Sequence, residues 1–496
     1  MKRRTALVLS LGIGGCTVGP DYDAPDLAVP AAFAGRDVGT SAVAPVDDAW
    51  WRSFGDAVLD RLVARALRGN TDVRIAVARL REARAIATRT SAEALPRLDV
   101  DGSYSNSQFA KNGFLRNIIG GGSGSLPGAV FPGQRIDLHQ VDLDASWELD
   151  LFGGVRRARE AAAADLAGAE HDLHAVLVSL LGEVASGYFE LRGLQERLAV
   201  ATRTAEDRRA ARDVLAEQVR AGVADELDLA RAETDLATAR SHVPDLESRV
   251  HGALRRLEVL AGTMPGTLTA DLAVPRAMPA MPEALGAGIP SDVLRRRPDV
   301  QAAERRLAAA VARVGVAAAD LYPRFSLTGQ FGLQSLRLGD LAESDSVFWL
   351  LGPSVRWPLF DFGRVRARID AADARAAAAL SDYEGAVLRA LADVEIALVR
   401  LVRDRRRAVD LAEARGAAER ARSLAEERHR SGVLEYLDLL DSQRVFDEAR
   451  DRELVAMQDV ALDVVGLFKA LGGGWEIADT SPVGDVDDVR VTKSVR

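Results

Sequence analysis

Residues 220–228 read RAGVADELD and residues 430–438 read RSGVLEYLD, so one short motif occurs twice, 210 positions apart. The same offset, without a gap, aligns WELDLFGGVR (147–156) with WPLFDFGRVR (357–366). A chance match would fade on either side of the motif, whereas a duplicated module continues in register. The repeated motif therefore predicts that the chain contains two copies of one structural unit.

A second register covers the region upstream of these motifs. An offset of 227 aligns Asp72 and Val73 with Asp299 and Val300, and it also aligns PR at 96–97 with PR at 323–324. The two offsets differ by 17, so the first copy holds 17 more residues between its proline and its tryptophan. The extra segment includes GGGSGSLPG, a composition typical of a surface loop.

The two registers divide the chain into segments. The period is far longer than that of solenoid repeats, so we expect a duplicated domain. The expected segments are a signal peptide (1–15), an acylated linker (16–54), a first repeat (55–262), an inter-repeat linker (263–288), a second repeat (289–474) and a polar tail (475–496).

The composition favours long helices packed through small side chains. Only 5% of the residues are aromatic, and alanine runs recur along the chain. The formal net charge is −9, and the arginine run RDRRR at 403–407 is interpreted as a solvated helix face. Because no larger basic cluster accompanies it, nucleic acid is not an expected partner.

The first 16 residues resemble a bacterial lipoprotein signal. A basic MKRR is followed by a short apolar stretch, IGG and Cys16, which is the only cysteine of the chain. The apolar stretch is too short to span a membrane, and a single cysteine cannot form an internal disulfide. We expect cleavage before Cys16 and its acylation, with palmitate among the acyl chains. Thr17 is not the aspartate that alters sorting in such signals, so the outer membrane is the expected destination.

Heptad spacing predicts long helical hairpins. From Val155 to about Val219 no proline occurs, and apolar residues recur at the intervals of a coiled-coil seam. The second copy repeats the seam. Each long helix should end at Gly222 or Gly432, because a glycine with positive φ commonly terminates a helix. A second helix of about 35 residues then returns, so both repeated motifs should form hairpin tips.

Four segments alternate apolar and polar residues, which indicates strands. They are residues 98–105, 141–149, 325–333 and 349–359. Alternation over about nine residues is typical of a membrane strand with one face toward lipid, although an ordinary half-buried hairpin shows it too.

Four residues are expected at the helix-to-strand junctions, and they are Pro96, Gly153, Pro323 and Gly363. The two prolines precede two of the strands, and the two glycines follow the other two. Four strands cannot close a membrane barrel alone, so several chains would have to share one.

Whole phrases of the chain resemble TolC-like outer-membrane efflux factors of the OprM/NodT lipoprotein branch. The clearest are CTVGPDYDAP (16–25), WELDLFGGVRRA (147–158), IPSDVLRRRPDVQAAERRLAAA (289–310), YPRFSLTGQFG (322–332) and FKALGGGW (468–475). The resemblance implies a mostly α, internally duplicated fold. Its helical hairpins form a periplasmic α-barrel, and its four strands join a trimeric, twelve-stranded outer-membrane β-barrel.

The resemblance also implies function and partners. Such proteins are passive exit ducts of tripartite pumps. They work as homotrimers with a periplasmic adaptor and an inner-membrane transporter, here expected to be of the RND type, and expel drugs or other small solutes. A duct for type I protein secretion is the alternative within the family. A periplasmic coiled-coil adaptor lipoprotein is a more distant alternative, but it would carry one hairpin and small β domains.

The family's gate residues map onto the two tips. By this resemblance, Asp228 and Arg444 would form an ion pair between subunits, and Leu437 and Asp441 would line successive constrictions. Asp438 stands between them, and three copies of it would add a second acidic ring, which attracts cations. A family arginine latch near Leu434 has no counterpart here.

No pattern indicates an enzyme or a cofactor site. The chain lacks a nucleophile elbow, a phosphate-binding loop and a CxxC motif. His171 and His174 lie three residues apart on an expected helix, but without a further ligand they are interpreted as part of a solvated face and not as a metal site.

Overall fold

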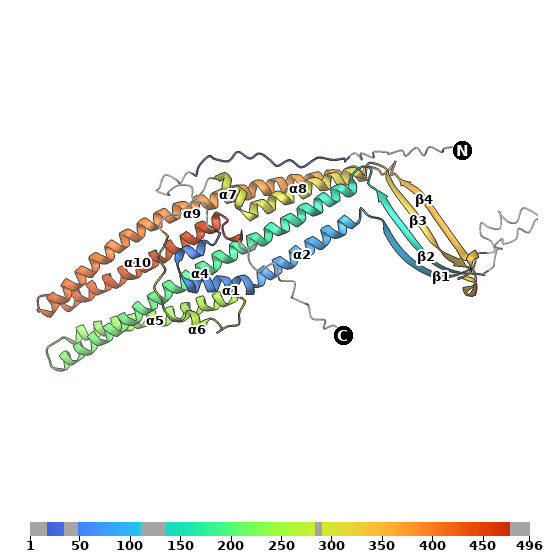
Figure 1. The fold of residues 1–496 in the computed structure, drawn as a ribbon. Helices are drawn as coiled ribbons and strands as arrows, with labels where there is room; N and C mark the ends of the chain where they lie inside the picture. Colours follow the sequence, from blue (N-terminus) through green and yellow to red (C-terminus); the bar gives the residue numbers. More distant parts are fainter. Residues whose placement is uncertain (1–16, 34–47, 109, 111–134, 283–289, 477–496) are drawn as a thin grey trace, which may run out of the picture. The chain divides into compact units, whose positions relative to one another are not determined.

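The computed structural model describes residues 17–33, 48–108, 110, 135–282 and 290–476 (Figure 1). The expected signal peptide, Cys16, the glycine-rich loop at 120–128 and the tail beyond residue 476 lie outside these residues. The chain forms two compact units. The sheet unit comprises Met1–Ala24, Glu82–Leu166 and Arg306–Leu380, and the helical unit comprises Pro25–Arg81, Ala167–Arg305 and Ser381–Arg496.

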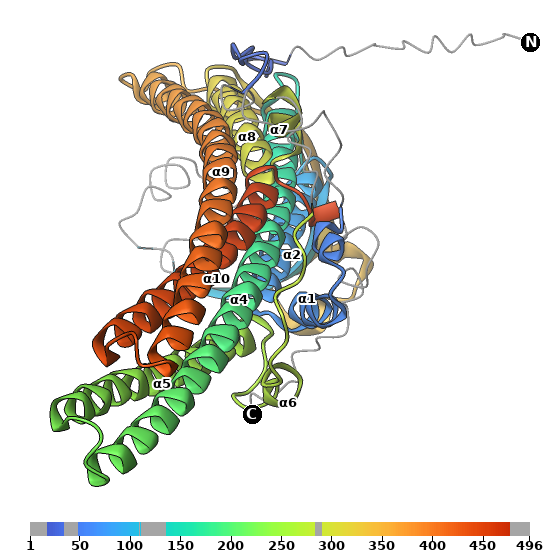
Figure 2. The same ribbon diagram turned by 90° about the vertical axis from the view of Figure 1, so that its left-hand side faces the viewer.

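Two long helical hairpins confirm the helix predictions. The first consists of α4 (Gly154–Arg220, 67 residues) and α5 (Glu226–Leu260, 35 residues). The second consists of α9 (Arg364–Arg430) and α10 (Tyr436–Ala470), which have the same lengths of 67 and 35 residues. Figure 2 shows the two hairpin ends in green and in orange to red. The equal lengths follow from the gapless 210-residue register.

Shorter elements complete the described chain. Their bounds are η2 Trp50–Phe54, α1 Ala57–Gly69, α2 Thr71–Ala92, α6 Thr269–Leu272, α7 Pro290–Arg296, α8 Pro298–Ala319, η3 Leu338–Asp340 and η4 Ser344–Ser346. Helices α2 and α8 hold corresponding positions in the two repeats, as the 227-residue register predicts. Among the described residues, no helix combines the length and the apolar composition needed to cross a membrane.

The core of the helical unit gathers the scarce aromatic side chains around the seam of α4. Leu177, Leu191 and other seam residues of α4 are buried, as the heptad pattern predicts. Trp50 stacks on Phe468 of α10 with ring centroids 4.9 Å apart. Asp56 caps α1 by accepting from the Val58 N–H at 2.7 Å, and it also accepts from the Tyr188 hydroxyl. Bulky residues thus fill one region, while alanines carry the packing elsewhere.

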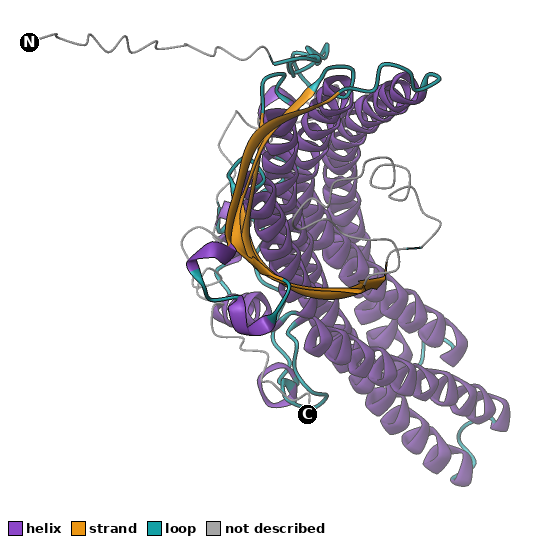
Figure 3. Ribbon diagram, turned by 90° about the vertical axis from the view of Figure 1, so that its right-hand side faces the viewer, coloured by secondary structure: helices purple, strands orange, loops and turns teal. Residues whose placement is uncertain are grey.

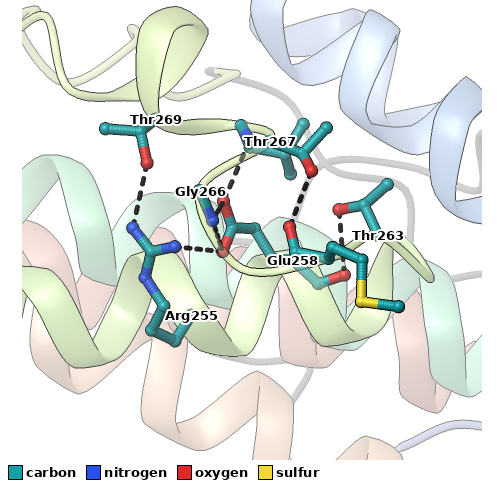
Figure 4. Close-up of polar contacts among 8 residues, drawn as sticks. Arg255, Glu258, Thr263, Gly266, Thr267 and Thr269 are labelled. Atoms are coloured by element: carbon teal, nitrogen blue, oxygen red, sulfur yellow. Dashed lines mark hydrogen bonds and ion pairs between the residues drawn. The ribbon is translucent and has the colours of Figure 1, made fainter.

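A buried carboxylate shapes the turn that follows α5 (Figure 4). Glu258 is 1% exposed and accepts from the backbone N–H groups of Gly266 and Leu268, each at 2.9 Å. Arg255 donates to it at 2.6 Å and also to Thr269 at 2.9 Å. Because charge-assisted bonds to buried groups are strong, this cluster fixes the exit of the chain from α5.

Four antiparallel strands form one sheet in the order β1-β2-β3-β4. The strands are β1 (Arg97–Gln108), β2 (Arg135–Leu149), β3 (Arg324–Ser335) and β4 (Val347–Arg356). Figure 3 shows that the sheet curves along its length. The pairing of β2 with β3, which joins the two repeats, places Ala145 opposite Gly329.

Two sequence predictions need correction. The fourth strand ends at Arg356 and not at residue 359, because Pro358 has no N–H for a ladder and Trp357 turns its indole N–H to the Leu321 carbonyl at 3.0 Å. His174 does not lie on a solvated face: it is 8% exposed and its ring stacks on Trp475 with centroids 4.5 Å apart.

The arginine run at 403–407 is only partly a solvated face. Arg405 donates to the Pro282 carbonyl at 3.0 Å, and Arg407 lies 3.0 Å from Asp459. The pattern of charges does not reveal these contacts, because the chain segments that supply the partners are distant in sequence.

Candidate gate and channel wall

Both hairpin tips use the same backbone turn. Gly222 has a φ of 72° and Gly432 a φ of 75°, so each adopts the left-handed conformation that glycine tolerates best. The N–H of the following valine returns to the last turn of the helix, from Val223 to Gln218 and from Val433 to Arg428, each at 2.9 Å. This arrangement closes the helix end and starts the reversal of the chain.

The tips leave apolar side chains uncovered, a feature that the sequence patterns did not reveal. Val223 and Val433 are each 76% exposed, and they occupy the same position in the two repeats. Leu227 is 55% exposed. Single exposed apolar residues are common, and the matching exposure of the two valines follows from the duplication of the tips.

The candidate gate residues of the second tip share one face of α10. Leu437, Asp441 and Arg444 follow the spacing i, i+4, i+7, and all three are exposed. Asp438 is also exposed, and its carbonyl accepts from the Ser442 hydroxyl at 2.6 Å. The first nine residues of α10 (Tyr436 to Arg444) therefore present an apolar side chain and three charges to solvent in the isolated chain.

Within one chain, the two proposed latch residues have partners on their own helices. Asp228 forms an ion pair with Arg231 at 3.1 Å, and Arg444 forms one with Asp441 at 2.9 Å. The side chains of Arg444 and Asp441 are 73% and 62% exposed. Such exposed pairs contribute about 0–1 kcal/mol, so either partner can be exchanged at low cost.

A buried arginine joins the two hairpins behind the tips, and the sequence analysis missed it. Arg208 of α4 is 8% exposed and lies 2.7 Å from Asp235 of α5 and 2.6 Å from Asp447 of α10. It also donates to Gln443 of α10. Burial raises the pKa of Asp447, while the attraction of Arg208 opposes the rise and Asp235 adds to it. The signal was present, because Arg208 occupies a seam position of the heptad where an apolar residue is expected.

The same network surrounds a tyrosine of the second tip. Burial raises the pKa of Tyr436, and the negative charge of Asp235 on the first hairpin adds to the rise. The ring centroid of His429 lies 5.8 Å from that of Tyr436, and its Nδ1 lies 2.9 Å from the Leu434 carbonyl oxygen. The second tip is thus braced by its own residues and by the first hairpin.

The four junction residues lie where strands meet helices. Pro96 directly precedes β1 and Pro323 directly precedes β3. Gly153 has a φ of 83° and Gly363 a φ of 84°, immediately before α4 and α9. An aspartate caps each of these helices: Asp150 accepts from the Arg156 N–H at 2.9 Å, and the equivalent device in the second repeat uses Asp361.

The sheet has one apolar and one polar face. Val100, Phe331 and Trp349 lie on the apolar face and are 72%, 58% and 74% exposed. On the other face, Asp142 is 5% exposed and accepts from the side-chain amides of Gln140 at 2.9 Å and Gln330 at 2.7 Å. An exposed apolar face backed by a hydrogen-bonded polar face is the pattern of a channel wall with lipid on one side and water on the other.

Among the described residues, no group of three or more histidine, cysteine or carboxylate side chains is placed to hold a metal ion. The ring centroids of His171 and His174 are 6.0 Å apart. Fold and site together define the class of protein: a membrane channel subunit built of duplicated helical hairpins and a two-faced sheet.

Comparison with known proteins identifies the family. The outer membrane efflux protein family matches residues 62–263 and 289–473, one match for each repeat. The chain is 32% identical to nodulation protein T of Rhizobium leguminosarum bv. viciae, with 95% of this chain and 94% of that protein covered. It is 32% identical to the pyoverdine export outer membrane protein OpmQ of Pseudomonas aeruginosa, with 96% and 98% covered.

A solved structure agrees. The outer-membrane channel OprN matches with a TM-score of 0.84 and 38% sequence identity, over 93% of this chain and all of that chain. The chain therefore belongs to the outer membrane efflux protein family, as its sequence motifs predict. It is an outer-membrane efflux channel, and this membership excludes the periplasmic adaptor alternative. Members of this family are conduits and not enzymes.

Proposed function

We propose that three copies of this chain form the exit duct of a tripartite pump, together with a periplasmic adaptor and an RND-type inner-membrane transporter. The duct passes drugs or other small solutes passively to the exterior. The observation that carries the proposal is the sheet itself. Strands β1 and β4 are its two edges, and its apolar face is exposed. In lipid such edges must be paired, and three copies close a twelve-stranded β-barrel.

The internal duplication predicts how the strands of neighbouring subunits pair to close the barrel. Within the chain, β2 of the first repeat pairs with β3 of the second. Repeating this relation around a ring pairs β4 with β1 of the partner subunit. The register of this pairing follows from the two offsets. Ala145 lies opposite Gly329 within the chain, the 210-residue offset takes Ala145 to Val355, and the 227-residue offset takes Gly329 to Gly102. We therefore expect Val355 opposite Gly102 of the partner subunit.

An exposed aromatic residue supports the same ring. Phe152 stacks on Tyr322 with centroids 4.6 Å apart, which is a contact between the first repeat and the second. The two offsets place Phe362 at the position of Phe152 and Leu95 at the position of Tyr322. The corresponding contact would therefore join Phe362 to Leu95 of the partner subunit. Phe362 is 97% exposed in the single chain and Leu95 is 64% exposed, so both side chains lack the cover that their counterparts have.

The proposed gate lies at the six tips of the trimer. Asp228 of one subunit and Arg444 of the next form the latch, and Leu437, Asp438 and Asp441 line constrictions. Gly222 and Gly432 allow the turns that present these side chains. Because Arg444 is exposed and Asp228 is only partly buried, each latch pair contributes about 0–1 kcal/mol. Several such pairs hold the gate closed together, and an adaptor that supplies alternative contacts opens it.

The amino terminus supplies a second attachment to the membrane. Removal of residues 1–15 leaves Cys16 at the start of the mature chain, where acylation anchors it in the outer membrane. An acyl chain contributes about 0.8 kcal/mol per buried methylene, so more than one chain gives stable anchoring. The proposed repeat boundaries are 55–262 and 289–474, with linkers before each repeat and a polar tail after the second.

The test of the assembly is a cysteine pair across the predicted subunit interface. Val355→Cys with Gly102→Cys should yield, on mild oxidation, a covalent ladder that ends at three chains. The site at Gly102 has room, since a Cβ there meets nothing within 4 Å. Val355→Cys with Ser103→Cys is the matched control, because Ser103 points to the opposite face of β1. Equal cross-linking of both pairs, or a ladder that stops at two chains, would contradict the proposed ring.

A further inference from the structure

A buried arginine at the start of α4 holds the segment that directly follows Cys16. The Arg157 side chain is 4% exposed. Its Nε donates to the Val18 carbonyl at 3.2 Å, and its Nη2 donates to the Gly19 carbonyl at 3.3 Å and to the carboxylate of Asp21. Its Nη1 donates to Glu160 on the same helix at 2.8 Å. All these residues belong to the sheet unit.

Backbone contacts seat the same segment against the strand-to-helix junction. The Val18 N–H donates to the Phe152 carbonyl at 3.1 Å. A Cβ on Gly153 would lie 2.9 Å from the Cα of Thr17, so a glycine is needed there for close approach as well as for its φ of 83°. The segment therefore lies directly on the turn between β2 and α4.

Two glycines, Gly19 of the segment and Gly315 of α8, form a notch in which the segment approaches α8 closely. Gly19 has a φ of 90°, and a Cβ on it would lie 2.4 Å from the Cα of Gly315 on α8. A Cβ on Gly315 would lie 2.8 Å from the Cγ of Arg157. Because neither position tolerates a side chain, the peptide backbone and the arginine stem fit against α8 without space for either to shift.

The second repeat shows that helix packing alone does not require this notch. The 210-residue register places Ala367 at the position of Arg157, and the 227-residue register places Thr88 at the position of Gly315. A Cβ on Gly363, the counterpart of Gly153, meets nothing within 4 Å. The junction that contacts the amino-terminal segment therefore combines an arginine of the first repeat with a glycine of the second, and neither residue recurs at its duplicated position.

We propose that Arg157, Gly315 and Gly153 form a docking site for residues 17–21, and that this site fixes the acyl anchor beside the strand-to-helix junction. The inference rests on the proposed acylation of Cys16. Two residues of extended chain reach at most about 7 Å, so docking at Val18 keeps the anchor close to the sheet unit. Without it, the next residue with an interaction of its own is Tyr22, six residues from Cys16, a reach of about 20 Å.

The longer tether has a kinetic consequence. Effective concentration falls as roughly the −3/2 power of linker length, so a change from two residues to six lowers it about five-fold. Arg157 is thus a positioning residue: it holds the end of the sheet near the membrane surface to which the acyl chains are attached. Loss of the contact should slow the appearance of assembled trimer in the outer membrane about five-fold, while trimers that do form keep the wild-type conductance.

The first test is amide hydrogen exchange of the detergent-purified full chain, read at Val18. Arg157→Ala and Gly19→Ala break the contact from opposite sides, and both should abolish protection of this amide. The double variant should add nothing, because one contact is lost in each case. Arg313→Ala is the control, since this exposed arginine of α8 pairs with Asp165 and does not touch the segment. An unprotected Val18 amide in the wild type would overturn the docking site.

The second test separates positioning from folding. Assembly of newly made trimer is followed by pulse-chase in cells, with and without the acyl anchor. Without the anchor, the chain is exported by a non-lipoprotein signal peptide and carries Cys16→Ser. Arg157→Ala should slow assembly only when the anchor is present, and Arg157→Lys should restore part of the rate. Equal slowing in both backgrounds, or no slowing in either, would overturn the positioning role. Single-channel conductance of the wild type tests the proposed channel function independently of the docking site.

Discussion

Replacing Arg208 should weaken the contact between the two hairpins of each chain near their tips and favour the open gate. Arg208→Met keeps the length and apolar stem of the side chain but removes the charge that lies between Asp235 and Asp447. The two carboxylates would then lack the arginine between them, and Arg422 would be the remaining positive charge acting on Asp447. The substitution therefore perturbs the tie between the hairpins without touching the residues of the tips.

The magnitude follows from burial. Removing one partner of a fully buried ion pair costs about 3–5 kcal/mol, and the side chain of Arg208 is 9% exposed. The aspartates are 28% and 31% exposed and can rehydrate, so the lower end, about 3 kcal/mol, is appropriate. Since every 1.4 kcal/mol corresponds to a factor of ten, the balance between closed and open tips should shift by roughly 100-fold per chain.

Single-channel recording in planar bilayers measures this shift directly. Arg208→Met should raise the open fraction, and more so at high pH. Burial already raises the pKa of Asp447, and Arg208 is the main opposing influence, so its loss raises that pKa further. Protonation at low pH then relieves the repulsion from Asp235. Arg209→Met, at the exposed neighbouring position, is the control. An Arg208→Met channel as closed and as heat-stable as the wild type would refute the proposed tie.

Four further substitutions test a buried carboxylate, a group with a raised pKa and the two residues of the proposed latch. Glu258→Gln should lower the free energy of unfolding by about 2–3 kcal/mol in thermal or denaturant unfolding, because it removes charge-assisted bonds to a 1% exposed group; unchanged stability would contradict the role of this carboxylate. Burial and then the hydrogen bond with Asp404 raise the pKa of Asp463 from 3.8 to about 7, so the folded chain binds an extra proton and its stability falls as pH rises between these values. Asp463→Asn should remove that fall and stabilise the protein at pH 8 by about 1 kcal/mol, after a discount for partial exposure, and a stability curve parallel to that of the wild type would count against it. Asp228→Ala and Arg444→Ala should each increase conductance, and the double variant should add little, since one latch is lost in all three; additive effects would show that the two residues act separately.

The duplication explains why much of the fold follows from sequence alone. One internal register predicts both hairpins at once, so each helix end is supported by two independent stretches of chain. The turn glycines Gly222 and Gly432 lie at those ends because only a residue that tolerates positive φ fits there. The alternation of apolar and polar residues likewise predicts the strands, apart from the end of β4, where Pro358 interrupts the hydrogen-bond ladder.

What the sequence did not reveal are contacts between segments that no periodic pattern connects. Arg192 has no exposed surface and donates to the Val274 carbonyl at 2.9 Å, although an arginine in a helix pattern is ordinarily placed on the surface. Arg208 and Arg157 are similar cases. Each arginine is buried against hydrogen-bond acceptors of a distant segment, and the sequence around the arginine does not identify those acceptors.

The central claim is that this chain forms a gated duct whose closed end lies at the second tip. Single-channel conductance of the detergent-purified wild type, recorded beside Asp441→Ala, tests it most directly. We expect a small, cation-preferring conductance in the wild type, because rings of carboxylates attract cations. We expect a larger or less selective conductance in the variant. An unchanged conductance would place the gate elsewhere, and no conductance from the wild type would contradict the duct itself.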